Sequence, residues 1–544
     1  MRKKTLSALL CTVAAMAVLT GCGGDKKETA AAPAEANTTA AVTEAAKTEA
    51  ETTAAAQTEA GGEKNLVMPS ASCVANLNPL LEGYKEAAML NPIYDPLYVI
   101  DVNETRYYLA DSYEVSEDGM QITVKLKEDL KWHDGEAITA DDMIFTMDVC
   151  SDTNNGAGGT NIVILNDQPV KYEKVDDLTV KVTLPMASAS YADLLGGLTL
   201  IPEHVFEGNP SVVSAGEANM KGIGSGPYKV TEFKQDEYLL LEKYEDYYMG
   251  APSIDKVTFR IISDLSAQEV ALMNGEVNFM ELANAPAVAK YEADPNFTVV
   301  KYPEGRVNYL AVNKFCETVQ DPKVVEAVFA ALNRDEIIAG AYGDGMAESA
   351  NSIFSNVNTF YDPSVEGYTQ DVEKAKQLVK ETGLDSKTLT LYFNSERVYM
   401  KESAQIIQQQ LKNVGINLEV IPLESAGFFE KVFGTDGDYE FYLNGYGAVG
   451  DPDQVVAGMY DGTWGVNLAV SDEVSQLWKD ARTVYTPEER AAIYKQIQIQ
   501  TRDELTCYPI AYPNYVFVTT SNIKGADTIK RTPVFEDYTK LTME

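Results

Sequence analysis

Residues 23–63 offer almost nothing that could join a packed core, so a folded body is expected over residues 64–544. From residue 23 to about residue 63 the chain is mainly alanine, threonine and glutamate, with almost no branched aliphatic or aromatic side chains. Such a segment buries too little apolar surface to offset the entropy of ordering its backbone. We therefore predict a disordered linker, starting from Cys22 and reaching residue 63, ahead of a folded body.

The residues before this linker have the pattern of an export signal. The chain starts MRKK and continues as an uncharged, mostly apolar stretch up to residue 19, as the n- and h-regions of secretory signals do. The next residues, Thr20, Gly21 and Cys22, complete a match to the bacterial lipobox, in which cleavage precedes an acylated cysteine. We predict a lipoprotein signal peptide over 1–21 and lipidation of Cys22.

The alternative to a cleaved lipoprotein signal is an uncleaved membrane anchor. No charged residue lies between Thr5 and Gly24, and this length is about enough for one crossing of a bilayer. In both cases the folded body is tethered to the cell membrane on its extracellular side, which is the periplasmic space if the host has an outer membrane.

The strong negative charge excludes several function classes. With 44 Lys+Arg against 82 Asp+Glu, the formal net charge is −38, which repels nucleic-acid phosphates. The chain has two His, six Cys and no CxxC pair, so a zinc site or a dense disulfide framework is not expected. Up to two disulfides or buried free thiols remain open for the cysteines of the body, Cys73, Cys150, Cys316 and Cys507.

Alternating apolar residues predict several short, half-buried strands. Ile122, Val124 and Leu126 alternate with polar residues, and the same period recurs over 178–184 and 257–261. Strand patterns dominate to about residue 300, helices alternate with strands to about 510, and the last segment is strand-like again. This order predicts an α/β protein with two lobes whose C-terminus returns to the first lobe.

Helix signals are clearest in the later half of the chain. Asp321 followed by Pro322 predicts a helix N-terminus, and Gly383 predicts a helix end. The helix that ends at Gly383 is predicted to start near Asp371, Ser471 is predicted to cap another helix, and Thr486 is predicted to open one with a capping box.

Motifs for enzymatic chemistry are weak. A loop with spaced glycines, GIGSGPYKV, leads through Pro227 into a strand pattern, whereas a nucleotide loop should precede a helix. A serine or cysteine hydrolase would need His133 or His204 as its base, and each sits in a context typical of structural or surface histidines. We predict no catalytic residues, no metal and no cofactor. A secreted hydrolase remains the alternative because carboxylates are abundant.

Many ordered segments resemble one known family. The strongest runs over 109–147, LADSYEVSEDGMQITVKLKEDLKWHDGEAITADDMIFTM, and IPEHVF, GIGSGPYKV and DLSAQEVALMNGEVNF follow it in order. YLAVN, DPKVVEAVFAALNRDEII, DVEKAKQLVKETG and IIQQQLKNVGINLEV continue the match. Together they resemble the family 5 extracellular solute-binding proteins of ABC importers, which include dipeptide, oligopeptide and nickel binders.

The resemblance implies a two-lobed Venus-flytrap fold of the periplasmic-binding-protein type II, cluster C, with an extra subdomain in the first lobe. It places 64–305 and 512–544 in the first lobe and 306–511 in the second, with hinges near 300–307 and 510–516. It also implies a monomer that closes on a ligand and is recognised by the permease subunits of an ABC transporter.

Residue roles can be transferred from the family at a few positions. In peptide-binding members a Gly-Trp loop contributes an aromatic contact, and an acid three residues beyond the Trp holds the α-amine of the peptide. Here the loop reads GYGAVGDPD, so Tyr446 replaces the Trp, Val449 takes the place of the acid, and Asp451 is the nearest carboxylate. The ligand-binding residues that the resemblance implies are Cys73, Arg397 as a carboxylate partner, Tyr446, Asp451, Trp464 and Asn467.

These features predict a lipid-anchored receptor that captures a small solute and delivers it to an ABC permease without covalent chemistry. A short peptide is the favoured cargo. The missing acid beside Tyr446 motivates the alternative within the same fold, a nonpeptide cargo such as an oligosaccharide, an opine or a metal chelate.

Overall fold

The computed structural model describes residues 63–82, 89–100, 104–447, 449–460, 468, 470–528 and 537–544. All of them belong to one compact unit, Ala60–Glu544. The predicted signal peptide, Cys22, almost all of the predicted linker, Trp464 and Asn467 lie outside the described residues. Within these ranges, none of the helices combines the length and the apolar character needed to span a bilayer.

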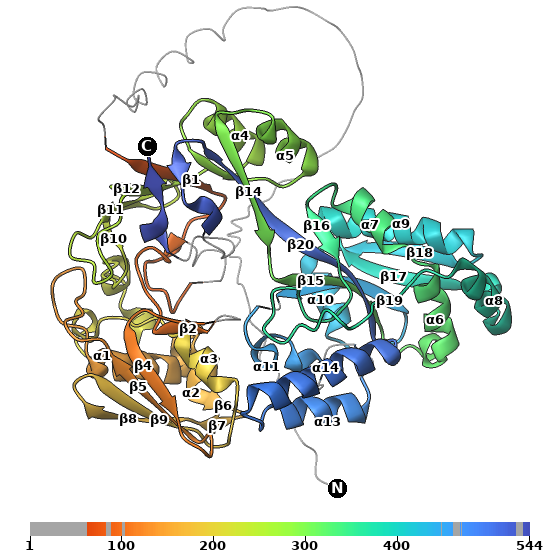
Figure 1. Ribbon diagram of the computed structural model, residues 1–544, viewed down its shortest axis with the longest axis horizontal. Helices are drawn as coiled ribbons and strands as arrows, with labels where there is room; N and C mark the ends of the chain where they lie inside the picture. Colours follow the sequence, from red (N-terminus) through yellow and green to blue (C-terminus); the bar gives the residue numbers. More distant parts are fainter. Residues whose placement is uncertain are drawn as a thin grey trace, which may run out of the picture. The chain divides into compact units, whose positions relative to one another are not determined.

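One antiparallel sheet has the order β4-β5-β9-β8 and forms the centre of a hydrophobic core (Figure 1). Ile122, Val124 and Leu126 are buried in it, so the predicted alternation is confirmed. The core is completed by three helices and two small ribbons. The bounds are β4 (Ala110–Val115), β5 (Gln121–Leu126), β8 (Lys171–Asp176), β9 (Thr179–Thr183), α1 (Ala140–Ser151), α2 (Thr160–Val163), α3 (Tyr191–Gly196), β2 (Tyr98–Ile100), β3 (Thr105–Tyr107), β6 (Ile164–Leu165) and β7 (Gln168–Pro169).

A second sheet has the order β1-β12-β11-β10, with β1 parallel to β12. The chain's C-terminal residues pack in the same core, through Leu541 and Met543. Pro227 leads directly into β10, as a strand rather than a nucleotide-binding helix. The bounds are β1 (Asn65–Ser70), β10 (Tyr228–Lys234), β11 (Tyr238–Lys243), β12 (Lys256–Ile261), β21 (Ile523–Lys524) and β22 (Thr542–Met543).

The third sheet is eight-stranded, and one long strand, β20, runs through it. Its first part pairs with β15 and its last part with β14, and β14 ends at Pro303 just before β15 begins at Arg306. The order is β13-β20-β15-β19-β17-β18, with β14 and β16 also pairing with β20. The bounds are β13 (Phe279–Glu281), β14 (Phe297–Pro303), β15 (Arg306–Val312), β16 (Ala347–Ser349), β17 (Thr388–Asn394), β18 (Asn417–Leu423), β19 (Phe441–Gly447) and β20 (Cys507–Thr520).

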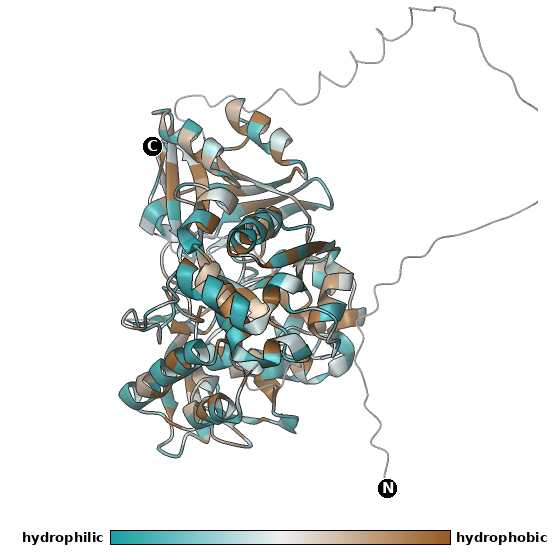
Figure 2. Ribbon diagram, turned by 90° about the vertical axis from the view of Figure 1, so that its right-hand side faces the viewer, coloured by the Kyte–Doolittle hydropathy of each residue, from teal (hydrophilic) through white to brown (hydrophobic). Residues whose placement is uncertain are grey.

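Helices cover both faces of the β15-β19-β17-β18 part of this sheet. Leu310 and Val312 face a core that includes α6, α8 and α9, whereas Tyr309 and Ala311 face a core that includes α13 and α14. Figure 2 shows helices along which hydrophilic and hydrophobic residues alternate, as in amphipathic helices. The bounds are α4 (Leu265–Met273), α5 (Ala285–Glu292), α6 (Pro322–Ala331), α7 (Arg334–Ala341), α8 (Val372–Thr382), α9 (Val398–Asn413), α10 (Ser425–Val432), α11 (Pro452–Val455), α12 (Ala457–Tyr460), α13 (Asp472–Ala481) and α14 (Pro487–Asp503).

Most of the predicted helix ends are confirmed by their hydrogen bonds. Asp321, Asp371 and Ser471 each accept a bond from a main-chain N–H of the first turn. Gly383 ends α8 in the left-handed conformation, with φ of 65°, which glycine adopts without strain. The capping box at Thr486 is wrong: α14 begins there, but the Thr486 side chain makes no capping bond.

A carboxyl group is buried among tyrosines beside the second sheet. Asp95 is 5% exposed, and its Oδ2 accepts hydrogen bonds from the hydroxyls of Tyr247 at 2.8 Å and Tyr248 at 2.7 Å. Burial raises the pKa of Asp95 from 3.8 to about 7, against the lowering effect of the two tyrosine hydroxyls. The folded protein therefore binds this proton more tightly than the unfolded chain does.

Replacing Asp95 with asparagine is expected to remove this pH dependence. Because the folded pKa is raised, the stability contributed by Asp95 is complete below pH 3.8 and is lost as the pH rises through about 7. The free energy of unfolding of D95N, relative to wild type, should therefore rise by about 4 kcal/mol over that interval. Urea denaturation at several pH values measures it. The exposed Asp111→Asn serves as control, and a difference between D95N and wild type that is constant with pH would contradict this assignment.

Candidate functional site

The crossing from β14 to β15 lies directly against the loop that follows β19. The Glu304 N–H donates to the Pro513 carbonyl of β20 at 2.9 Å, which ties the two crossing segments together. Gly305 has φ of +72°, and a Cβ at this position would lie 1.9 Å from Cγ2 of Val449. The apolar side chain of Val449 therefore lies against the crossing. The residue is also 54% exposed, so it faces solvent as well.

Tyr446 is packed into the protein from β19. Its ring lies 5.1 Å from the ring of Tyr309, and its hydroxyl donates to the Ile353 carbonyl at 2.7 Å. The same hydroxyl is 3.1 Å from the hydroxyl of Tyr460. Tyr446, which the resemblance implies as a ligand contact, is therefore a half-buried residue whose hydroxyl is satisfied inside the protein.

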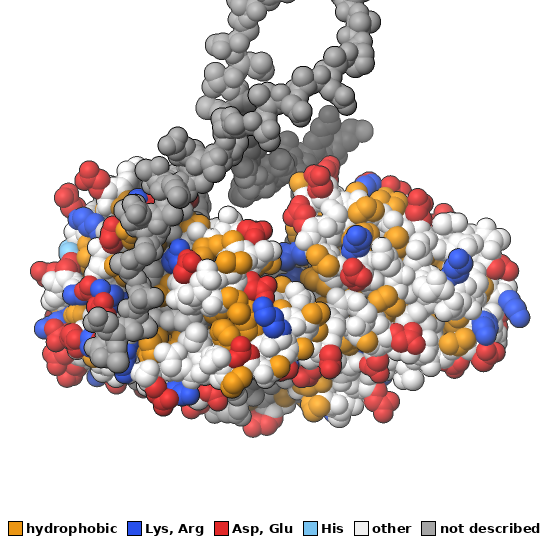
Figure 3. Space-filling model, turned by 90° about the horizontal axis from the view of Figure 1, so that it is seen from above, with side chains coloured by type: hydrophobic (Ala, Val, Ile, Leu, Met, Phe, Trp, Pro, Cys, Tyr) orange, Lys and Arg blue, Asp and Glu red, His pale blue; other side chains and the backbone are white. Residues whose placement is uncertain are grey.

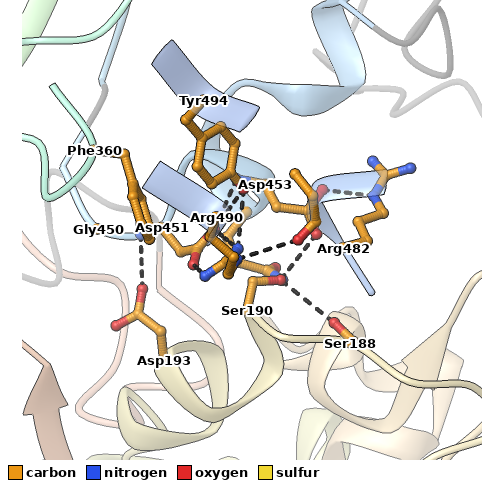
Figure 4. Close-up of polar contacts among 12 residues, drawn as sticks. Ser188, Ser190, Asp193, Phe360, Gly450, Asp451, Asp453, Arg482, Arg490 and Tyr494 are labelled. Atoms are coloured by element: carbon orange, nitrogen blue, oxygen red, sulfur yellow. Dashed lines mark hydrogen bonds and ion pairs between the residues drawn. The ribbon is translucent and has the colours of Figure 1, made fainter. Parts of the chain in front are cut away.

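Asp451, two residues after Val449, forms a buried ion pair with Arg490 of α14. Arg490 donates from Nη1 to Oδ2 at 2.6 Å and from Nη2 to Oδ1 at 3.0 Å, and Asp451 and Arg490 are 8% and 5% exposed. Tyr494 adds a hydrogen bond to Oδ1 at 3.3 Å, and the guanidinium lies 4.9 Å from the ring of Phe360 (Figure 4). Both oxygens of this carboxylate are thus bound within the protein.

The next acid in the loop, Asp453, is bound in the same way. Its Oδ1 accepts from Nε of Arg482 at 2.6 Å, and its Oδ2 accepts from the hydroxyl of Ser190 at 2.9 Å. Its side chain is 7% exposed. The two carboxylates that follow Val449 therefore both have internal cationic partners, which the sequence pattern did not reveal.

Basic side chains gather on the α9 side of the crossing. Arg397 lies just before α9 and is exposed, whereas Arg306 donates to the Gly445 carbonyl at 2.7 Å and to Oδ1 of Asn308 at 3.1 Å. Burial raises the pKa of Glu304, and the positive charges of Arg306 and Arg397 oppose the rise. Arg397 was predicted from the sequence as a ligand contact, whereas Arg306 was not. The sequence feature that could have indicated Arg306 is its position in the predicted hinge, directly after Gly305.

Cys73 lies in another part of the structure, after β1. It is half-buried, and burial raises the pKa of its thiol, with Asp236 and Glu82 as neighbouring acids. It is a free thiol, as are the other three described cysteines, Cys150, Cys316 and Cys507. Of the predicted ligand-binding residues, Tyr446 thus lies near the end of β19 and Asp451 in the loop after it, whereas Arg397 lies near the crossing and Cys73 beside Asp236.

Both histidines are hydrogen-bonded within the protein. Nε2 of His133 lies 2.9 Å from the Gly226 carbonyl, Nδ1 accepts from the Gly224 N–H at 3.2 Å, and burial lowers the pKa of this imidazole to about 4. Nε2 of His204 lies 2.8 Å from Oδ2 of Asp134. In the described part of the chain, no three His, Cys, Asp or Glu side chains gather as metal ligands would.

Acidic side chains are spread over the surface seen in Figure 3, with basic ones between them. The excess of acidic over basic side chains corresponds to the formal net charge of −38.

Comparison with known proteins gives the family. Residues 104–467 match the bacterial extracellular solute-binding proteins, family 5. The dipeptide-binding protein of Escherichia coli is 27% identical over 499 residues, which cover 85% of this chain and 92% of that protein. The oligopeptide-binding protein AppA of Bacillus subtilis is 28% identical over 447 residues, which cover 77% and 80%.

Solved structures of similar proteins agree with this family match. The ABC transporter substrate-binding protein CtaP of Listeria monocytogenes superposes with a TM-score of 0.82 at 33% identity, covering 88% of this chain and 99% of that one. A putative peptide-binding protein AppA of Clostridium difficile gives 0.81 at 33% identity, covering 89% and 100%. The two-lobed α/β fold expected from the sequence is confirmed, as is the role of substrate-binding protein for an ABC importer. This chain belongs to the family 5 bacterial extracellular solute-binding proteins.

Proposed function

We propose that this protein captures a short peptide between its two lobes and delivers it to the permease subunits of an ABC importer. The observation that carries the proposal is that relatives covering most of the chain are described as peptide binders, among them the E. coli dipeptide-binding protein. AppA of B. subtilis was solved in complex with a nonapeptide, and it superposes with a TM-score of 0.69 at 26% identity over 89% of this chain.

In this proposal the first lobe comprises residues 64–305 and 512–544, and the second lobe comprises residues 306–511. The chain passes between them where β14 gives way to β15 and along the middle of β20, so these segments act as the hinge. A ligand that touches both lobes binds the closed form more tightly than the open form and shifts the balance toward closure. The closed, loaded form is then the one that the permease recognises.

Arg397 and Arg306 suit the carboxylate end of a peptide. A guanidinium offers several N–H donors in a fixed geometry that matches a carboxylate. Arg397 is exposed beside the crossing, and Arg306 is held in place by Gly445 and Asn308. We assign Arg397 the direct contact with the ligand carboxylate and Arg306 a supporting positive charge.

A nonpeptide cargo is the second candidate, and the loop after β19 favours it. Val449 presents an apolar side chain where the family places an amine-binding acid, and the carboxylates of Asp451 and Asp453 are engaged by Arg490 and Arg482. An amine bound here would have to compete with a guanidinium for either carboxylate. A ligand with a blocked or absent α-amine meets no such competition.

Isothermal titration calorimetry with matched peptides tests the proposal and separates the two candidates. Peptides of two to nine residues are each titrated in a free form and an N-acetylated form. Tight binding of any peptide supports the peptide receptor, and equal affinity for the two forms shows that the α-amine is not anchored. Binding of opines or oligosaccharides, with none of the peptides bound, would favour the second candidate. Chromatography of the recovered peptides should show no cleavage, because we propose no covalent chemistry.

We further propose that Cys22 is the lipidated N-terminus, that residues 22–63 form a flexible leash, and that the receptor is a monomer. The leash would let the body reach the permease while it remains tethered to the membrane. Expression of Cys22→Ser is expected to move the protein from the membrane fraction into the medium or periplasm. Retention of the variant in the membrane would instead favour the uncleaved anchor.

A further inference from the structure

A polar contact joins the region around α3 to the loop after β19 and to the segment between α13 and α14 (Figure 4). The Ala189 N–H donates to the Arg482 carbonyl at 2.9 Å, and the Asp451 N–H donates to Oδ2 of Asp193 at 2.9 Å. Ser190 is at its centre, because its hydroxyl donates to Oδ2 of Asp453 at 2.9 Å and accepts from Nε2 of Gln454 at 2.6 Å.

The two surfaces also pack closely against each other at two glycines. Gly119, in the turn between β4 and β5, has φ of +65°, and a Cβ there would lie 1.9 Å from the Tyr485 ring. The Tyr485 hydroxyl donates to the Gly119 carbonyl at 3.3 Å. Gly450 has φ of +83°, and a Cβ there would lie 3.1 Å from Oδ2 of Asp193. Side chains at either glycine would push the two surfaces apart.

The two surfaces belong to separate hydrophobic cores. Tyr191 and Leu195 of α3 pack into the core of the β4-β5-β9-β8 sheet, whereas Trp478 of α13 and Tyr494 of α14 pack into the core beside β15 and β19. The bonds that connect the surfaces are polar, and water can replace each of them when the surfaces separate. This contact can therefore open without disturbing either core.

We propose that this contact is a latch that holds the two lobes closed, with Ser190, Asp193, Asp453 and Arg482 as positioning residues that set ligand affinity through closure. The inference rests on the proposed function, in which closure traps the ligand. The covalent crossings between the lobes are at β14–β15 and β20, so the latch is a second and reversible attachment. Asp453 is bonded to Arg482 within its own lobe and to Ser190 across the contact. In a latch of this kind the first bond persists when the lobes open and the second breaks.

Hydrogen–deuterium exchange on the full-length protein tests the latch directly. In Ser190→Ala the segments 189–193 and 450–454 should exchange about tenfold faster than in wild type, because the variant favours the open form. The effect should be clearest at Ala189 and Asp451, whose N–H groups bond across the contact. The amides of β9 and α14 should exchange as in wild type. Ser214→Ala, at an exposed serine of the same lobe, should leave all of these rates unchanged.

Peptide titration gives a second readout. The affinity of Ser190→Ala should fall about 5- to 10-fold through faster release, with an unchanged melting temperature of the ligand-free protein. If no peptide binds even wild type, the proposed function fails, while the exchange rates still decide whether the latch exists. Unchanged exchange at 189–193 and 450–454 would overturn the latch, as would faster exchange throughout both cores.

A second pair of variants covers the case in which Ser190→Ala misfolds. Gly119→Ala places a methyl group where Tyr485 sits and should raise the exchange of the latch segments. Adding Tyr485→Ala to it removes the clash, so the double variant should exchange more slowly than Gly119→Ala at Asp451 and Ala189. Equal exchange in the single and double variants would contradict the latch.

Discussion

Replacing Arg490 with methionine is expected to lower the free energy of unfolding by about 3–5 kcal/mol. The substitution removes both bonds from the guanidinium to Asp451 and leaves a carboxylate that is 8% exposed without its cationic partner. Burial of an unpaired charge is among the largest single-residue effects on stability. Methionine keeps much of the side-chain volume beside Phe360 and Tyr494, so the loss comes mainly from the charge. Urea denaturation followed by circular dichroism measures it.

Two controls isolate the ion pair. The double variant Asp451→Asn with Arg490→Met has no buried charge at this place and should recover part of the lost stability. Lys323→Met breaks an exposed pair, in which Lys323 and Glu381 lie 2.9 Å apart with side chains 55% and 38% exposed. It should cost less than about 1 kcal/mol. If Arg490→Met alone is at least as stable as the double variant, the buried Asp451 carboxylate is not destabilising without Arg490.

Replacing Arg397 with alanine is expected to weaken binding of peptides with a free C-terminal carboxylate by about 10- to 150-fold, the range for a lost charge-assisted hydrogen bond. Binding of the same peptides with an amidated C-terminus should change little, because they offer no carboxylate to the guanidinium. Calorimetry with both forms gives the ratio. Arg306 stays in place through Gly445 and Asn308, so the fold near the crossing is retained.

Lys401→Ala is the matched control for Arg397, because Lys401 is an exposed cation one turn further along α9. It should leave both affinities unchanged. An equal loss for free and amidated peptides in Arg397→Ala would mean that the residue acts on packing or closure rather than on a carboxylate. No loss for either form would remove Arg397 from the binding site.

Local structure could be predicted from the sequence because its signals are local. Ile122, Val124 and Leu126 are buried on one face of β5 because successive side chains of a strand point to opposite sides. Asp321 and Ser471 cap helices because their short polar side chains reach the free N–H groups of the first turn. At Thr486 the same reasoning fails, since the pattern allows a capping box but does not oblige the side chain to form it.

The site was less predictable because it depends on contacts between distant residues. Nothing near Asp451 in the sequence shows that Arg490 and Tyr494, from the next long helix, bind its carboxylate. The tyrosine at position 446 was expected in the site as an aromatic contact, but only the fold shows that its hydroxyl bonds the Ile353 carbonyl. The pairing of Ser190 with Asp453 joins residues 263 positions apart and is likewise set by the tertiary fold alone.

Native mass spectrometry of the protein as purified, before and after mild denaturation, tests the central claim most directly. The account predicts a discrete added mass on the native protein that is released on denaturation and fragments as a short peptide. Adding that peptide back at 100 times its dissociation constant should stabilise the fold by about 2.7 kcal/mol. A protein that carries no ligand, binds no peptide from a broad panel and instead releases cleaved products from added substrates would contradict the account.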